Sequence, residues 1–266
     1  MNFRNRVELT LEGGVAHVQL VRADKMNALD PEMFTAILEA GSHLFDEPAA
    51  RCVVLSGAGR SFCAGLDLAS MGQTDRHRET PLTERTHGNA NAPQQAAMVW
   101  RKLPIPVIAA IHGVCFGGGL QIASGADIKI VTPDARLAVM EVKWGLIPDM
   151  AGYVLWRGNV RDDVLRELTW THREFTGEEA VQFGFATHVD ANPLARAMAL
   201  AQDIAGKSPH AVRAAKTISN KWLDSTNDQL LMAESHEQQK LMGSKNQREA
   251  VLAGLEKRKA EFVDPS

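Results

Sequence analysis

Two glycine-containing segments could place backbone N–H groups against a ligand, because each directly follows a short apolar run. The first extends from Ser56 to Leu68 (SGAGRSFCAGLDL), and the second extends from His112 to Ala123 (HGVCFGGGLQIA). Glycine lets the backbone turn towards a ligand without interference from a Cβ atom. In the second segment Gly117, Gly118 and Gly119 lead into a helical pattern, so their amides lie at the positive end of a helix. Such amides could bind an oxygen that carries or develops negative charge.

Three kinds of site could use these amides, and two of them lack their sequence signature. A dinucleotide-binding turn requires G-x-G-x-x-G, whereas GAGRSF lacks the third glycine and GVCFGGG has the wrong spacing. A Walker A loop requires GK[ST] before its helix, which neither segment contains. An oxyanion hole, in which one N–H from each segment meets the oxygen of an ester or thioester, is compatible with both. The alternative is two tight turns that bind no ligand.

The elements that must position these segments follow an α/β pattern. Asp30 and Pro31 predict the N-cap and first position of a helix over 31–45. Short runs that are apolar or alternate with period two predict strands. Continuous apolar strands favour a parallel sheet that is covered on both faces. The predicted strands cover 15–21, 52–56, 107–111, 128–131 and 137–140.

The last third of the chain is rich in Ala, Leu, Glu and Lys, and it predicts helices without strands. We therefore divide the chain into an α/β core over 1–192, which contains both glycine segments, and an all-helical C-terminal region over 193–266. The segment 71–95 is polar and contains two prolines, which indicates a mobile loop or a short helix. The predicted C-terminal helices cover 193–206, 208–225, 227–242 and 247–262.

Composition and charge exclude several classes of function. The 266 residues include 45% hydrophobic and 23% charged residues, with a net charge of −3, so a basic nucleic-acid-binding surface is not expected. Three cysteines without a CxxC pair indicate neither a disulfide framework nor a zinc site, and no metal is expected. The uncharged stretch 103–126 has the length of a membrane span, but its two prolines and five glycines favour a buried strand, a turn and a helix start. With no apolar leader in its first residues, the chain is expected to be cytoplasmic.

Several motifs in order resemble the crotonase superfamily, the enoyl-CoA hydratase/isomerase family, over nearly the whole chain. The resemblance implies a spiral of β-β-α units followed by a helical trimerisation region. It also implies homotrimers or dimers of trimers and acyl-CoA thioester substrates, with coenzyme A as part of the substrate and no further cofactor. The matching runs are RADKMNAL (22–29), SGAGRSFCAGLDL (56–68), HGVCFGGG (112–119), ASGADIKIVTPDARLAVMEVKWGLIP (123–148), FTGEEAVQFG (175–184) and LEKRKAEF (255–262).

By this resemblance, the main-chain N–H groups of Leu66 and Gly118 are the oxyanion donors. Family hydratases use two glutamates about twenty residues apart, whereas this chain has Gln121 at the first position and Glu141 at the second. An amide cannot exchange a proton at neutral pH. Asp149 lies eight residues beyond Glu141, where family members that shift double bonds in dienoyl-CoA carry an acid. We therefore expect Glu141 and Asp149 to divide the proton transfers, although Asp149 could instead be the N-cap of a helix that begins near residue 151.

The resemblance favours double-bond isomerisation over hydration, because Gln121 replaces the first glutamate. The alternatives are a hydratase with Glu141 as its sole carboxylate and a non-catalytic acyl-CoA-binding protein of the same fold. A Rossmann-type nucleotide enzyme ranks behind both, since its fingerprint is missing. Further positions are expected to contact the acyl-CoA, although Lys25 could equally be a solvated charge and the helix of Lys257 could be core or interface. These positions are Lys25, Ala28, Ala64, Asp67, Gln121, Trp144 and, from a neighbouring subunit, Lys257.

Overall fold

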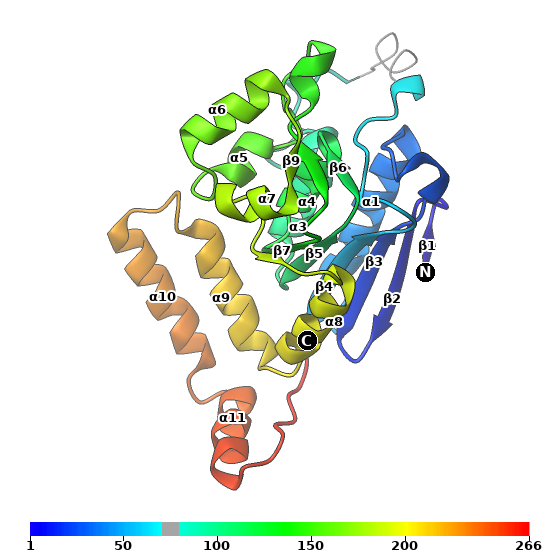
Figure 1. The fold of residues 1–266 in the computed structure, drawn as a ribbon. Coiled ribbons are helices and arrows are strands. Elements are labelled where there is room, and N and C mark those ends of the chain that lie inside the picture. Colours follow the sequence, from blue (N-terminus) through cyan, green and yellow to red (C-terminus); the bar gives the residue numbers. More distant parts are fainter. Residues whose placement is uncertain (71–79, 266) are drawn as a thin grey trace.

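A computed structural model describes residues 1–70 and 80–265 of the chain. Its main sheet has seven strands in the order β1-β2-β3-β4-β5-β7-β10 (Figure 1). The first three strands are antiparallel, and pairing is parallel from β3 to β10. The strands are β1 (Asn2–Phe3), β2 (Val7–Glu12), β3 (Val15–Leu20), β4 (Cys52–Gly57), β5 (Val107–Ile111), β7 (Ile128–Val131) and β10 (His188–Val189).

A small second sheet lies beside the main one and carries the elements next to the second glycine segment. It contains β6 (Val114–Phe116), β8 (Arg136–Ala138) and β9 (Phe175–Thr176), in the order β6-β8-β9. The short helix α4 (Gly118–Ser124) starts directly after β6, and all of its residues are buried. Backbone pairing of β6 with β8 therefore fixes the start of α4 relative to the chain that leads to Glu141.

The central strands of the main sheet are buried on both faces, as their apolar residues predict, whereas β2 is exposed on one face. Every residue of β4 and β5 is buried. Val53 and Leu55 belong to the larger core cluster together with residues of α1 (Pro31–Phe45) and α3 (Ala92–Lys102). Val54 faces the opposite way and packs in a second cluster with α8 (Pro193–Ala205). Burying alternate side chains on both faces removes them from water and holds the strand ends in fixed positions.

The remaining helices cover the upper part of the core or extend from it as the C-terminal region. Figure 1 shows α10 and α11 standing away from the sheet. Among the described residues, neither helix contributes a side chain to the two core clusters, and α10 has no buried residue. The division of the chain at residue 193 stays a prediction. The first helix after that residue, α8, packs against the main sheet. These helices are α5 (Gly152–Trp156), α6 (Asp162–Thr171), α7 (Gly177–Phe183), α9 (Pro209–Lys221), α10 (Asn227–Leu241) and α11 (Lys245–Glu256), with single 3₁₀ turns at η1 (Ala23–Lys25) and η2 (Glu141–Trp144).

Local sequence signals located several elements accurately. The helix over 31–45 has the predicted bounds, and its N-cap Asp30 accepts a hydrogen bond of 2.8 Å from the amide of Met33. The strands over 107–111 and 128–131 also match. Both agreements follow from strong local preferences, namely a capping side chain before proline and runs of β-branched residues.

Other element boundaries were wrong. The helix predicted over 247–262 covers only Lys245–Glu256, because Lys257 takes a left-handed conformation with φ 55° and ends it. The helix predicted over 208–225 ends at Lys221. The strand predicted over 137–140 covers 136–138, after which the chain turns into η2. Of the segment 71–95, residues 71–79 lie outside the described part, residues 80–91 form turns, and α3 begins at Ala92.

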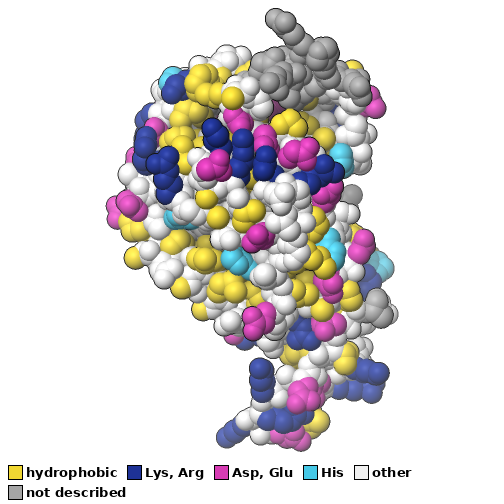
Figure 2. Space-filling model, turned by 90° about the vertical axis from the view of Figure 1, so that its right-hand side faces the viewer, with side chains coloured by type: hydrophobic (Ala, Val, Ile, Leu, Met, Phe, Trp, Pro, Cys, Tyr) yellow, Lys and Arg dark blue, Asp and Glu magenta, His cyan; other side chains and the backbone are white. Residues whose placement is uncertain are grey.

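Several absences hold for the described residues. The three cysteines are buried and unbridged. Within residues 1–70 and 80–265, no three or more His, Cys, Asp or Glu side chains lie close enough together to bind a metal ion. Within the same residues, none of the helices combines the length and the apolar character that a membrane crossing requires. On the face in Figure 2, basic and acidic side chains are interspersed, with hydrophobic ones between them.

Candidate active site

The two glycine segments meet, as an oxyanion hole requires. The amide of Cys63 donates to the carbonyl of Val114 at 3.1 Å, and the amide of Phe116 donates to the carbonyl of Cys63 at 3.0 Å. A Cβ atom on Gly65 would lie 2.8 Å from the carbonyl oxygen of Phe116 and 3.8 Å from the nitrogen of Gly118. The close approach of the two segments therefore depends on glycine at position 65.

The direction of the Leu66 amide follows from the peptide bond that carries it. The carbonyl of Gly65 accepts a hydrogen bond of 2.8 Å from the amide of Leu29. In a planar trans peptide the C=O and the following N–H point in opposite directions, and the described chain has no cis peptide. The N–H of Leu66 therefore points away from Leu29, and no backbone acceptor for it occurs among the described residues.

The amide of Gly118 is directed in a comparable way. The carbonyl of Gly117 accepts a hydrogen bond of 3.0 Å from the amide of Gln121, so it points along α4. The N–H of Gly118 belongs to the same peptide and therefore points out of the beginning of the helix. Among residues 1–70 and 80–265 these two donors, one from each segment, have no backbone acceptor, and they lie at neighbouring positions. Their assignment to a thioester oxygen stays a prediction.

Glu141 begins η2 and is almost entirely buried, with 7% of its surface exposed. Its Oε1 accepts a hydrogen bond of 2.7 Å from Nε2 of Gln121, and its Oε2 has no partner among the described residues. Burial raises the pKa of Glu141, and the hydrogen bond from Gln121 works in the opposite direction. A Cβ on Gly117 would lie 3.3 Å from Oε1, so the carboxyl group lies beside the glycine triplet.

Gln121 is itself buried, and most of its hydrogen-bonding capacity is used within the protein. Its Oε1 accepts from the amides of Met150 and Gly152, each at 2.9 Å. Its Nε2 donates to Glu141, which leaves one N–H of the carboxamide. Gln121 was predicted to contact the substrate, and that contact stays a prediction.

Asp149 lies in the segment between η2 and α5, directly before Met150. The N-cap of α5 is Ala151, so the alternative reading of Asp149 as the cap of this helix was wrong. The carboxylate of Asp149 is close enough to contribute to the raised pKa of Glu141 through like-charge repulsion. The two carboxylates that the sequence singled out therefore share one electrostatic environment.

The thiol of Cys63 lies near Leu66 but cannot act as a nucleophile in this state. Burial raises its pKa to about 12, and its Sγ donates to the carbonyl of Asn27 at 3.1 Å. A thiol needs deprotonation for nucleophilic attack. The amides and carboxyl groups therefore remain the candidate groups for chemistry at this site.

The loop over 22–30 packs against the segment that carries Leu66. The guanidinium of Arg22 pairs with the carboxylate of Asp67 at 2.7 Å and lowers its pKa. Ala64 donates its amide to the carbonyl of Met26 at 2.9 Å. Asp67, which was predicted to contact the substrate, is thus held by Arg22 within the protein.

The other residues that were predicted to contact the acyl-CoA differ in their exposure to solvent. Ala28 is buried and Ala64 half-buried, whereas Lys25 is exposed at the end of η1. Trp144 is 48% exposed at the end of η2, with the ammonium group of Lys143 5.3 Å from its ring centroid. Lys257 follows α11, which Figure 1 places at the other end of the molecule from α4. Within one chain, Lys257 therefore does not share a site with α4.

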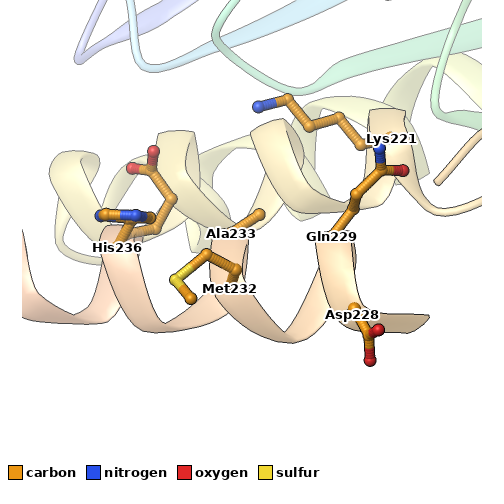
Figure 3. A pocket seen from close by; sticks show the side chains of 7 residues that line it. Lys221, Asp228, Gln229, Met232, Ala233 and His236 are labelled. Carbon is orange, nitrogen blue, oxygen red and sulfur yellow. The ribbon is translucent and has the colours of Figure 1, made fainter. Parts of the chain in front are cut away.

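Two hollows lie on the C-terminal helices, away from Glu141. The first, of about 460 Å³, lies along α9 and α10 and is lined by Lys221, Met232 and His236 among others (Figure 3). The second, of about 530 Å³, lies among α9, α10, α11 and the C-terminal tail. Neither includes a residue of the glycine segments, so neither is part of the site described above.

Comparison with known proteins places this arrangement in a family. The sequence model described as "Enoyl-CoA hydratase/isomerase" matches residues 10–265. This chain belongs to the enoyl-CoA hydratase/isomerase family. The predicted resemblance is confirmed, and so is the crotonase fold. A solved enoyl-CoA hydratase from Bacillus anthracis superposes with a TM-score of 0.87 at 25% identity, over 97% of this chain and 98% of that one.

Relatives within the enoyl-CoA hydratase/isomerase family bear both kinds of name. The mouse mitochondrial Delta(3,5)-Delta(2,4)-dienoyl-CoA isomerase is 35% identical over 214 residues, which are 76% of this chain and 64% of that protein. The peroxisomal isomerase of that name from Arabidopsis thaliana is 31% identical over 263 residues, which are 95% of this chain and 94% of that protein. Enoyl-CoA hydratase EchA19 from Mycobacterium tuberculosis is 32% identical, over 74% of this chain and 73% of its own.

Sequence reasoning missed two residues that hold the first glycine segment in place. The side-chain Nδ2 of Asn27 donates to three carbonyls of the first glycine segment, those of Ala58, Ser61 and Phe62, at 2.9–3.1 Å. Arg22 was not singled out either, although it holds Asp67. An asparagine beside a glycine-rich turn tolerates positive φ, and Asn27 has φ 55°. That tolerance is the signal that could have pointed to it.

Proposed function

We propose that this protein shifts a double bond in an unsaturated acyl-CoA thioester, acting as a dienoyl- or enoyl-CoA isomerase. The observation that carries the proposal is the set of groups around Glu141. An amide, Gln121, contacts its carboxyl group, and a second carboxylate, Asp149, contributes to its raised pKa. The set contains two proton carriers and a neutral neighbour, which suits the movement of a proton from one carbon to another.

The proposed reaction begins at the thioester carbonyl. Its oxygen would accept hydrogen bonds from the amides of Leu66 and Gly118, which stabilise the negative charge that develops when a proton leaves C2. For a 3,5-dienoyl thioester, one of the two carboxylates takes the C2 proton and a conjugated trienolate forms. The other carboxylic acid then returns a proton to C6, which leaves double bonds at C2 and C4. Atoms and charge balance without a cofactor, since coenzyme A is part of the substrate.

The raised pKa of Glu141 supports its role as a proton carrier. An acid that holds its proton at higher pH is better matched to proton transfer near neutrality than an exposed carboxylate. The similarity to proteins named dienoyl-CoA isomerase points to the same reaction.

Hydration is the second candidate, because a similar protein is named an enoyl-CoA hydratase. In that reaction Glu141 would be the sole carboxylate that activates water. A non-catalytic acyl-CoA-binding protein is the third, in which the amides bind the thioester without proton transfer. We also propose contacts to the acyl-CoA from Lys25, Ala28, Trp144 and, from a neighbouring subunit, Lys257, in a cytoplasmic homotrimer or dimer of trimers.

The purified protein should be assayed with two thioesters in parallel. With a 3,5-dienoyl-CoA, an isomerase forms a conjugated 2,4-dienoyl product, which is followed by its ultraviolet absorbance at unchanged mass. With crotonyl-CoA, a hydratase consumes the double bond and adds the mass of water. Turnover of the dienoyl thioester supports the proposal. Turnover of crotonyl-CoA alone would replace it with hydration, and binding without turnover of either would leave the non-catalytic reading.

A further inference from the structure

The carboxamide of Gln121 is held in one orientation by the backbone of a distant segment. Its Oε1 accepts from the amides of Met150 and Gly152, 29 and 31 residues further along the chain, each at 2.9 Å. A flipped carboxamide would present its NH₂ group to two backbone N–H groups, which are donors and cannot accept a hydrogen bond from it. The orientation is therefore unambiguous, and Nε2 is the atom that faces Glu141.

This fixed orientation distinguishes the two oxygens of Glu141. Nε2 donates to Oε1 at 2.7 Å, which is short for an N–H···O bond and fits a charged acceptor. Oε2 is buried and has no hydrogen-bond partner among the described residues. A buried carboxylate oxygen without a partner is unfavourable for folding alone. The arrangement leaves Oε2 as the atom that can exchange a proton with a substrate.

The same amide also anchors the segment that carries the second carboxylate. Asp149 is the residue before Met150, whose amide Gln121 binds. The side chain of Met150 lies against α4, since a Cβ on Gly118 would be 2.8 Å from its Sδ. Gln121 therefore links three parts of the site: the start of α4, Glu141, and the segment of Asp149.

We propose that Gln121 is a positioning residue, rather than a substrate contact, which directs proton transfer to Oε2 of Glu141 and holds the Asp149 segment at a fixed place beside it. The proposal rests on the isomerase function proposed above. A glutamine suits this role because its amide does not titrate, so Glu141 keeps the same donor at every pH. A glutamate at position 121 would face Oε1 with a second carboxyl oxygen, and the two groups would have to share a proton.

The test is a titration of Glu141 by ¹³C NMR in protein labelled at the glutamate carboxyl carbons. The signal of Glu141 is assigned by its loss in Glu141→Gln. In Gln121→Met, which has a side chain of similar length but no hydrogen-bonding amide, Glu141 should titrate about 1 to 2 pH units higher than in the unmodified protein, because a donor to the charged form is lost. The acid limb of kcat/KM should move upward by the same amount.

Ser124→Ala is the matched control. Ser124 lies one turn further along α4 and accepts a hydrogen bond of 2.8 Å from Nε1 of Trp156 in α5, so it joins the same two helices without contacting Glu141. We expect this variant to lose thermal stability while the titration of Glu141 is unchanged. A structural role of Gln121 alone would give the same pattern in both variants.

A second variant keeps the test decisive if Gln121→Met does not fold. Gln121→Glu retains an acceptor for the amides of Met150 and Gly152, and it should raise the pKa of Glu141 through the shared proton. If Glu141 titrates at an unchanged pH in whichever variant folds, the positioning role is refuted. The titration needs no substrate, so a failure of the proposed isomerase activity, seen as no turnover by the unmodified protein, is recognised separately.

Discussion

The approach of the two glycine segments can be tested by substituting the residue that permits it. Gly65 has φ +87°, in the left-handed region that favours glycine, and its α-carbon faces the carbonyl of Phe116. In Gly65→Ala the new Cβ would lie 2.8 Å from that carbonyl oxygen, whereas ordinary contacts begin at 3.4 Å. The two segments must therefore separate by several tenths of an ångström.

Two costs follow from this substitution. Holding a non-glycine residue in the left-handed region costs about 1–2 kcal/mol of folding free energy. Separation of the segments also displaces the N–H of Leu66 relative to the N–H of Gly118. Loss of one oxyanion donor lowers kcat by about 10²- to 10³-fold, and a displacement smaller than 1 Å should reach the lower end of that range. We expect kcat with the dienoyl thioester to fall by about 100-fold.

Gly13→Ala separates the two costs. Gly13 lies in the turn between β2 and β3 with φ +56°, and a Cβ there would meet nothing within 4 Å. This variant should lose a similar amount of stability in thermal unfolding and keep its full kcat. If a folded Gly65→Ala protein retained a rate within threefold of the unmodified protein, the two amides would not act together as an oxyanion hole.

Three further variants test charged side chains that are buried or half-buried. Glu141→Gln should lower kcat by at least about 10²-fold, since it removes a proton carrier. The same variant should be more stable than the unmodified protein at neutral pH. Burial raises the pKa of Glu141 above 4.5, so the folded protein keeps this proton to a higher pH than the unfolded chain does. The unmodified protein therefore loses stability as the pH rises from 4.5 through the higher pKa of the folded state. Lys216→Met should cost about 1–3 kcal/mol in urea unfolding with kcat/KM unchanged, because the buried Nζ of Lys216 donates to the carbonyls of Trp100 and Ile105 as well as to the carboxylate of Asp127. Asp67→Asn should lower kcat about tenfold at constant KM in steady-state assays, because the ion pair with Arg22 positions the segment of Leu66.

Controls for these variants are available on the surface. Lys207→Met removes a lysine of an exposed pair with Asp203, so it should change stability by less than about 1 kcal/mol. Asp24→Asn lies in the exposed η1 turn of the same loop as Arg22 and should keep kcat. An equal loss of stability in Lys207→Met and Lys216→Met would contradict the argument from burial. An unchanged kcat in Asp67→Asn would mean that the ion pair does not position Leu66.

Glycines, caps and apolar runs made much of the fold predictable from sequence. Asp30 before Pro31 specifies a helix start through local geometry, and the run Val107–Ile111 forms a buried strand. The extent of the last helix was not predictable in the same way. Lys257 ends α11 in a left-handed conformation, although its residue type favours helix continuation.

The sequence by itself determined two glycine turns after strands, and its resemblance to the enoyl-CoA hydratase/isomerase family singled out Glu141, Asp149 and the amide of Gln121. These features depend on residue type and local spacing, which the chain carries without its fold. Only the tertiary structure decided which atoms pair. Gln121 binds amides about thirty residues away, and Asp67 binds Arg22, because strand register and helix packing bring these distant segments together. Burial, which also arises only from packing, then raises the pKa of Glu141 and leaves its Oε2 without a partner among the described residues.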